Sequence, residues 1–136
     1  MRADLRLLVA SHYDREAIFV MKTTQTLSAS NRDEFRQWLA NNHATQKDIW
    51  LVIYKKTSGE PSITLEEAVE EALCFGWIDG SMKSLDPKMY IQHFKPRRMG
   101  LNWTDANENL ARRLMAEGKM TEAGRATLPL ALKNGR

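Results

Sequence analysis

The run from Ala72 to Gly80, Ala-Leu-Cys-Phe-Gly-Trp-Ile-Asp-Gly, constrains the fold more than any other stretch of this chain. A helical pattern precedes it and an extended pattern follows it, so it marks a helix-to-strand junction. Glycine permits backbone angles and close approaches that other residues do not. We therefore expect a defined turn that places Trp77 and Asp79. These two residues are two apart in an extended stretch, so both should face the same side.

The residues before this junction predict a capped, amphipathic helix. Thr64 and Glu67 have the spacing of a capping box, and Gly76 is placed to end the helix. The apolar residues that recur at helical spacing are Leu65, Ala68, Val69, Ala72 and Leu73. The glutamates expected on the solvated face are Glu66, Glu67, Glu70 and Glu71.

The remaining patterns predict an α+β fold. A helix over 32–42 is capped by Asn31 with Glu34 three residues on, and further helices begin after Thr104 and Thr121. The last helix runs toward Asn134, and Pro129 should kink or shorten it. Strands are predicted over 49–55, 77–84 and 88–95. We expect a small antiparallel sheet of about three strands with about four helices packed on it.

A chain of 136 residues is one domain by size. We interpret 1–30 as a peripheral N-terminal extension that ends in a Ser/Thr-rich loop, and 31–136 as a single α+β domain. Residues 1–20 are expected to be an upstream extension or a cloning artefact. No apolar run reaches the roughly 18 residues that span a bilayer, and there is no signal-peptide core. We expect a cytoplasmic protein without membrane insertion.

The candidate reactive groups do not form a known catalytic or metal-binding pattern. Cys74 is the only cysteine, and a position near a helix C-terminus disfavours a thiolate, so we expect it to be buried and unreactive. His12, His43 and His93 lack the spacing of metal ligands. No phosphate loop or dinucleotide fingerprint is present. We therefore expect no metal and no cofactor, assign no catalytic residue, and favour a protein that is not an enzyme.

The binding candidates are Trp77, Asp79, Arg97, Arg98, Trp103 and Asn107. Arginine offers forked donors for phosphate or carboxylate, and tryptophan offers a stacking face. Asp79 has three interpretations: a general acid or base, an anchor for a cationic ligand, or a structural latch to Arg97 or Arg98. The lysines that could join this patch are Lys55, Lys56, Lys83 and Lys95.

The charge is unevenly distributed along the chain. Residues 88–136 hold ten basic and four acidic residues, which suggests an acidic partner such as an acidic protein face, a phosphate group or nucleic acid. A solvated surface is the simpler interpretation. No nucleic-acid-binding motif is recognisable, so nucleic acid is not the favoured partner.

Several motifs together resemble the bacteriocin-protection family, also called YdeI/OmpD-associated proteins. The resemblance spans about residues 31–136 and is carried by these segments: Phe35-x-x-Trp38-Leu39, Asp48-Ile49-Trp50-Leu51, Tyr54-Lys55-Lys56, Glu67-Ala68-Val69, Ala72 to Gly80, Phe94-x-Pro96-Arg97-Arg98, Trp103-x-x-x-Asn107 and Gly118-x-Met120-Thr121-x-Ala123-Gly124. Members are small bacterial proteins linked to an outer-membrane porin and to tolerance of bacteriocins or cationic antimicrobial peptides. The resemblance supplies no catalytic residues.

This chain departs from the family at its C-terminal end, where the usual further helical segment is absent. The residues expected to be left exposed there, and so to favour a homodimer, are Leu128, Leu130, Ala131 and Leu132. The leading hypothesis is a non-enzymatic stress-tolerance protein that binds a protein, a peptide or an anionic ligand through the candidates above. The alternatives are a small-molecule enzyme or sensor that uses Trp77, Asp79, Arg97 and Arg98, and a nucleic-acid binder that uses the basic C-terminal third.

Overall fold

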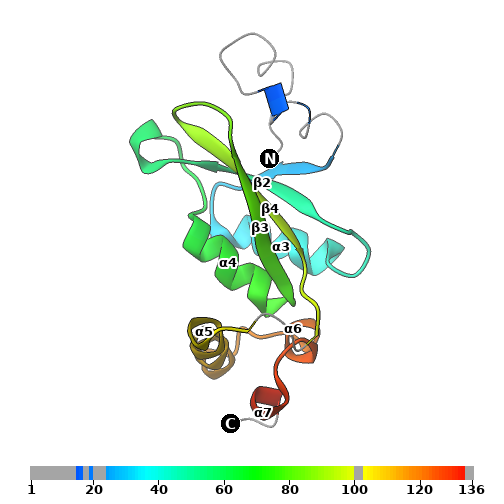
Figure 1. Cartoon of the computed structure of the whole chain (residues 1–136). Helices are drawn as coiled ribbons and strands as arrows, with labels where there is room; N and C mark the ends of the chain where they lie inside the picture. The colour runs from blue at the N-terminus through cyan, green and yellow to red at the C-terminus, as the bar shows by residue number, and fades with distance from the viewer. Residues whose placement is uncertain (1–14, 17–18, 20–23, 100–102, 134–136) are drawn as a thin grey trace.

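Four strands form one open sheet in the order β1-β2-β4-β3. The computed structural model describes residues 15–16, 19, 24–99 and 103–133. The strands are β1 (Thr26–Ser28), β2 (Ile49–Tyr54), β3 (Trp77–Ser84) and β4 (Met89–Pro96). Strand β1 pairs with β2 in parallel, whereas β2, β4 and β3 pair antiparallel. Figure 1 shows β3 and β4 as a long hairpin at one side of the sheet.

The predicted α+β class is confirmed, but two details of the sheet were wrong. The sheet has a fourth strand, β1, inside the stretch predicted to be loop, and this strand makes the sheet mixed rather than antiparallel. Three residues are too few to show the alternation by which a strand is recognised. The expectations for residues 1–14, 17–18 and 20–23 lie outside the described residues.

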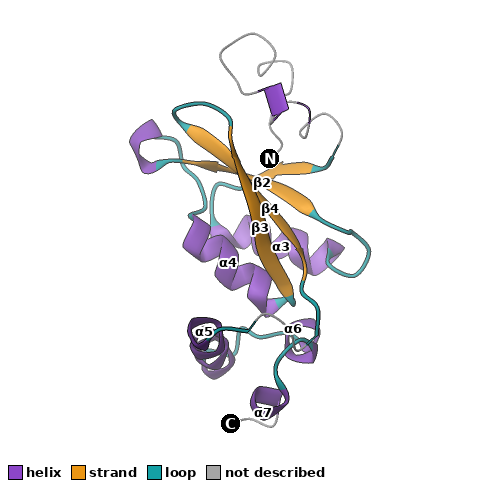
Figure 2. Ribbon diagram, in the orientation of Figure 1, coloured by secondary structure: helices purple, strands orange, loops and turns teal. Residues whose placement is uncertain are grey.

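The helices form two groups. Helices α3 (Arg32–Asn42) and α4 (Leu65–Cys74) pack on one face of the sheet, and a short 3₁₀ turn, η1 (Lys56–Ser58), follows β2 (Figure 2). Helices α5 (Asp105–Ala116), α6 (Glu122–Ala126) and α7 (Leu130–Lys133) lie beyond the end of the sheet where β3 begins (Figure 1). This second group contacts the sheet-covering helix α4 through α5 and α6. No helix in the described ranges is long and apolar enough to cross a bilayer.

The predicted helix starts are confirmed by their hydrogen bonds. The side chains of Asn31, Thr64, Thr104 and Thr121 each accept a hydrogen bond from the backbone N–H three residues on. Thr64 and Glu67 form both bonds of the capping box. The single helix predicted after Thr121 is instead two short helices, because Pro129 separates α6 from α7.

The main core lies between the sheet and helices α3 and α4. Ile49 and Leu51 of β2 are fully buried in it with Phe35 and Leu39 of α3. Alternate residues of a strand point to opposite faces, so Trp50, which lies between Ile49 and Leu51, points to the other face of the sheet. We call this second face, opposite α3 and α4, the outer face.

The expected apolar surface near the C-terminus is smaller than predicted. Leu128 and Leu132 are buried in the core, which corrects the expectation that both would be exposed. Leu130 is 75% exposed, and Ala131 is exposed beside it. Helix α7 has only four residues, and its Leu132 side chain points into the core. The run of apolar residues therefore predicted a larger exposed apolar area than the structure has.

Candidate functional site

The helix-to-strand junction is closed by contacts between backbones. Gly76 has φ +77°, which favours glycine, and a β-carbon there would lie 2.7 Å from Thr127 Cγ2 and 2.8 Å from the Ala123 carbonyl oxygen. A β-carbon on Gly124 would lie 2.2 Å from the Cys74 carbonyl oxygen. These glycines let α6 pack directly against the end of α4, which explains why the run contains glycine at position 76.

Thr121 fixes the same contact with two hydrogen bonds. Its backbone N–H donates to the Cys74 carbonyl at 3.1 Å, and its hydroxyl donates to the same oxygen at 2.6 Å. The Thr121 hydroxyl also accepts the N–H of Gly124 and so begins α6. One side chain therefore serves both as the cap of α6 and as a partner for an orphan carbonyl at the end of α4.

Arg97 and Trp103 hold each other next to this junction. The guanidinium carbon of Arg97 lies 4.3 Å from the centre of the Trp103 ring, and the Arg97 N–H donates to the Gly76 carbonyl at 2.8 Å. The indole N–H of Trp103 donates to the Thr127 carbonyl at 3.0 Å. Burial lowers the pKa of Arg97, and the nearby negative charge of Asp79 offsets part of that effect. The arrangement is that of a latch between the sheet and α6.

The structure separates the six binding candidates by environment. Trp77 is 2% exposed and packs edge-on against Trp38 in the core. Arg97 and Trp103 are brought together, as above. Asp79 lies two residues after Trp77 on β3, and the two pair with Phe94 and Pro96 of β4, respectively, so they share a face of the strand. Asp79 is exposed, unlike Trp77. Arg98 is also exposed.

Asn107, the sixth candidate, is half-buried in the first turn of α5, where its backbone N–H donates to the Thr104 hydroxyl. This bond is part of the N-terminal cap of α5. The residues that remain at the surface beside the latch are therefore Asp79 and Arg98, together with Met99, which is 67% exposed. We call Asp79, Arg98 and Met99 the sheet-end surface.

The lysines proposed to extend this patch lie apart from one another. Lys55 follows the end of β2, and its backbone N–H donates to the backbone carbonyl of Lys88, just before β4. Lys95 lies at the opposite end of β4. Lys83 forms an ion pair with Glu16. The described basic side chains of the sheet therefore sit at its two ends and do not form one continuous stripe.

Cys74 is buried, as predicted. Burial raises the pKa of its thiol, and the neighbouring Arg36 opposes that effect only in part. A buried thiol with a raised pKa is a poor nucleophile at neutral pH. Among the described residues, no group of three or more His, Cys, Asp or Glu side chains could hold a metal ion.

An acidic side chain that we placed on a solvated face is buried. Glu71 is 2% exposed and accepts hydrogen bonds from Arg32 at 2.7 Å and Arg36 at 2.9 Å. Glu70 is half-buried and is bound by Arg32 and Arg113. The prediction failed for these two residues because α3 and α5 both pack against α4 and bring arginines to the two carboxylates. A spacing of four residues between Arg32 and Arg36 was the available signal, since it places both on one helix face.

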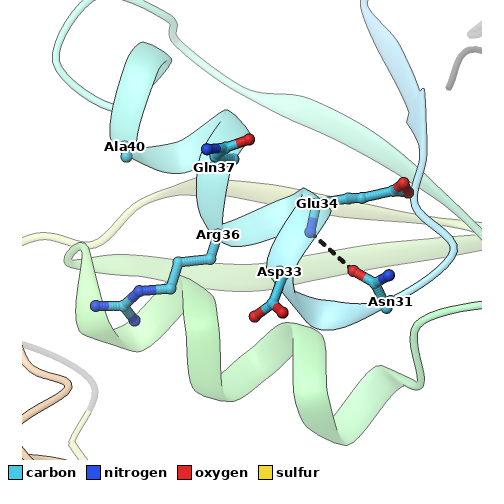
Figure 3. Close-up of a pocket in the computed structure, with 6 residues that line it drawn as sticks. All are labelled: Asn31, Asp33, Glu34, Arg36, Gln37 and Ala40. Atoms are coloured by element: carbon cyan, nitrogen blue, oxygen red, sulfur yellow. Dashed lines mark hydrogen bonds between the residues drawn. The ribbon is translucent and has the colours of Figure 1, made fainter.

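An open depression of about 460 Å³ lies along the outside of α3 (Figure 3). It is lined by Asn31, Asp33, Glu34, Arg36, Gln37 and Ala40. Three of its polar side chains already have partners: Asn31 caps the helix through the Glu34 N–H, the Glu34 carboxylate accepts the Ser30 N–H, and the Arg36 guanidinium bonds Glu71 and the Lys119 carbonyl. We therefore regard the sheet-end surface as the stronger candidate site.

The fold and this surface define an α+β protein with a mixed four-stranded sheet and a small helical group latched to one end. The chain belongs to the family described as a domain of unknown function, DUF8412, whose model matches residues 27–127. No curated protein and no solved structure matches it. The matched range begins in β1 and ends at Thr127, the residue whose carbonyl accepts the Trp103 hydrogen bond.

Proposed function

We propose that this chain is a non-enzymatic binding module that contacts an acidic segment of a protein partner through its sheet-end surface. One observation carries the proposal: the latch between Arg97 and Trp103 fixes this end of the sheet and leaves Asp79, Arg98 and Met99 exposed beside it. A rigid base with exposed side chains is what a binding surface needs, because little conformational entropy is lost when a partner binds.

The chemistry of the surface supports a protein partner. An exposed methionine can pack against varied apolar side chains, and methionine and arginine are enriched in interfaces. Charges around an apolar centre form the polar rim that is typical of such surfaces. Two side chains that could take part in catalysis are not available for it, which supports a binding role. Cys74 is buried, and the Arg97 guanidinium is in contact with the Trp103 ring.

The charge of the surface supports an acidic partner. The negative charge of Asp79 interacts electrostatically with the positive charge of Arg97. The guanidinium of Arg98 is exposed at the surface. Residues 88–136 also carry an excess of basic side chains. The basic excess of residues 88–136 disfavours a cationic antimicrobial peptide as the partner. If the resemblance to bacteriocin-protection proteins extends to function, we infer that protection is indirect and acts through an acidic protein.

Amide chemical shifts test the proposal directly. The ¹⁵N-labelled protein is titrated with an acidic peptide that contains leucine and methionine, with a cationic antimicrobial peptide of equal length, and with a single-stranded oligonucleotide. We expect the acidic peptide alone to shift amides at Asp79, Arg98 and Met99. Arg98→Glu should weaken this binding about tenfold, whereas Lys47→Glu, in the exposed loop before β2, should leave it unchanged.

Each other result counts against the proposal. Stronger binding of the cationic peptide would reverse the inferred charge of the partner and make protection direct. Oligonucleotide binding that falls steeply with added salt would favour the nucleic-acid alternative. No shift at the sheet-end surface with any of the three probes would overturn the proposed surface.

A further inference from the structure

The centre of the outer face is apolar and buried, although no described helix lies on that face. Val52 of β2 and Ile91 of β4 are paired in register, and they are 1% and 0% exposed. Both point outward, because Val52 lies two residues from Trp50 along the same strand. Helices α3 and α4 pack on the opposite face, and α5, α6 and α7 lie beyond the end of the sheet (Figure 2). An antiparallel sheet with helices on one face commonly leaves the other face in contact with water, so this burial needs an explanation.

The buried area continues toward the turn between β3 and β4. Met89 lies two residues before Ile91 on β4 and is 9% exposed, and Leu85, whose N–H donates to the Met89 carbonyl at 3.1 Å, is 2% exposed. Neither belongs to the main core between the sheet and helices α3 and α4, and the same is true of Val52 and Ile91. We call Val52, Leu85, Met89 and Ile91 the outer apolar group. It is a second buried group, separate from the main core.

The other end of the outer face is covered by its own side chains. The rings of Trp50 and His93 are stacked, with centroids 4.6 Å apart and an angle of 28° between the ring planes. The Nε2 of His93 lies 2.8 Å from Oδ2 of Asp48, and a β-carbon on Gly80 would lie 3.2 Å from His93 Nδ1, so β3 packs closely against the imidazole ring. These contacts account for the 7% exposure of Trp50. The outer apolar group lies further along β2 and β4 and requires a separate cover.

Glu16 brings the N-terminal part of the chain to this face. Lys83 of β3 is paired in register with Ile91, so its side chain points outward as well. The Lys83 ammonium forms an ion pair with the Glu16 carboxylate, 67 positions away in the sequence. Lys83 is half-buried, whereas Glu16 is exposed. This is the arrangement expected when the chain around Glu16 lies over the face and the ion pair forms at the rim.

The segment before β1 has the composition that such a cover requires. Two apolar runs, 7–10 and 17–21, lie on either side of Glu16 in the sequence, and they read Leu-Leu-Val-Ala and Ala-Ile-Phe-Val-Met. Phe19 is 66% exposed, so the second run faces the sheet with its other side chains. Neighbouring strands are about 4.8 Å apart, so a segment of this length is long enough to cross a four-stranded sheet.

We propose that residues 1–23 bind the outer face of the sheet as an intramolecular cover. The apolar side chains of the segment lie over Val52 and Ile91, and Glu16 pairs with Lys83 at the rim. The segment thereby shields an apolar surface that would otherwise bind other molecules. Residues 1–23 are then an integral part of the domain and not a peripheral extension. The outer face is separate from the sheet-end surface, so this proposal does not depend on the proposed function.

Methyl NOEs in the full chain test this contact. Protein labelled with ¹³C in the methyl groups of isoleucine, leucine and valine is studied alone and mixed with an equal amount of unlabelled protein. We expect cross-peaks from Val52 and Ile91 to methyl groups of residues 5–20, and no cross-peaks between labelled and unlabelled copies. Cross-peaks between copies would show that a second copy covers the face. That result, or the absence of any cross-peak to the segment, would overturn the proposal.

A double variant of the full chain shows whether the segment shields the face. Leu7→Ser combined with Leu8→Ser weakens the apolar contact, so the cross-peaks between the segment and the outer face should be lost, and binding of the dye ANS, which reports exposed apolar surface, should increase. Leu130→Ser is the control and should change neither, because Leu130 is already 75% exposed. Unchanged cross-peaks and dye binding in a double variant that is folded by circular dichroism would contradict the proposal. If the double variant does not fold, the NOEs of the unchanged chain decide the matter.

Discussion

The guanidinium group of Arg97 lies over the ring of Trp103 at 4.3 Å and joins the end of β4 to the segment that leads into α5. Arg97 is 8% exposed, whereas its neighbour Arg98 is exposed. Arg97 and Arg98 therefore offer a matched comparison, because these adjacent arginines differ in burial and in contact with the Trp103 ring. The contact also shows that a Pro-Arg-Arg sequence with a nearby tryptophan can be a structural feature as readily as a ligand site.

Arg97→Ala should lower the free energy of unfolding by about 2 kcal/mol, because a desolvated cation–π contact is lost. Arg98→Ala should change it by less than about 0.5 kcal/mol, as is usual for an exposed side chain. Urea unfolding followed by tryptophan fluorescence measures both. Equal effects of the two substitutions would show that the stacking does not stabilise the fold.

The local signals in the sequence predicted most helices and three of the four strands. Caps at Asn31, Thr64 and Thr104 depend on residues only three apart, so they can be read without knowledge of the tertiary structure. Strand β1 was missed because its pairing with β2, and not its own three residues, makes it a strand. The split between α6 and α7 was signalled by Pro129, although its extent was not.

The candidate site was less predictable, because its meaning depends on contacts between distant residues. Arg97, Arg98 and Trp103 were predicted as binding candidates, but only the structure shows that Arg97 and Trp103 contact each other. The pairing of Asp48 with His93 joins residues 45 positions apart and leaves no local pattern. Gly80 was noticed as part of the run, but its role depends on His93 of the neighbouring strand.

Gly124→Ala should destabilise the protein by about 3 kcal/mol, because the added β-carbon would lie 2.2 Å from the Cys74 carbonyl oxygen and would force α6 away from α4. Gly118→Ala provides the control. It has φ +73° but open space around its β-carbon position, so only backbone strain of about 1 kcal/mol is expected. Thermal unfolding of both variants measures the difference. A smaller loss for Gly124→Ala than for Gly118→Ala would contradict the close packing of α6.

Glu71→Ala should cost about 2–3 kcal/mol, since it removes a buried carboxylate that accepts hydrogen bonds from Arg32 and Arg36, whereas the two arginines are themselves partly exposed. Glu66→Ala, on the exposed side of the same helix, should change the stability by less than about 0.5 kcal/mol. Chemical denaturation of the two variants gives the comparison. Similar losses would mean that the ion pairs to Glu71 contribute nothing beyond helix propensity.

Cys74 should resist a thiol reagent in the folded protein. Its pKa is raised by burial, and its side chain is inaccessible, so modification requires opening of the structure. We expect the reaction with a colorimetric disulfide reagent at pH 8 to be at least about 10³-fold slower than in denaturant. The chain has one cysteine, so the signal reports this position alone. Rapid native labelling would show that the thiol is accessible and reopen a reactive role.

Protonation of Glu70 should lower the free energy of unfolding in acid. Burial by itself would raise the pKa of Glu70, but hydrogen bonds from Arg32 and Arg113 outweigh it, and the net pKa is lowered. The unfolded chain therefore takes up a proton at a higher pH than the folded chain does. The resulting stabilisation is complete above the unfolded pKa of about 4.3 and is lost as the pH falls through the folded value.

Urea unfolding at pH 7 and pH 3 measures this effect. The stability lost between the two pH values should be smaller in Glu70→Gln than in the wild-type protein, because the amide does not titrate. Glu66→Gln, whose carboxylate is exposed, should show the same loss as the wild-type protein. If Glu70→Gln also retains the full loss at pH 3, the ion pairs of Glu70 with Arg32 and Arg113 do not contribute to acid sensitivity, and other carboxylates must account for it.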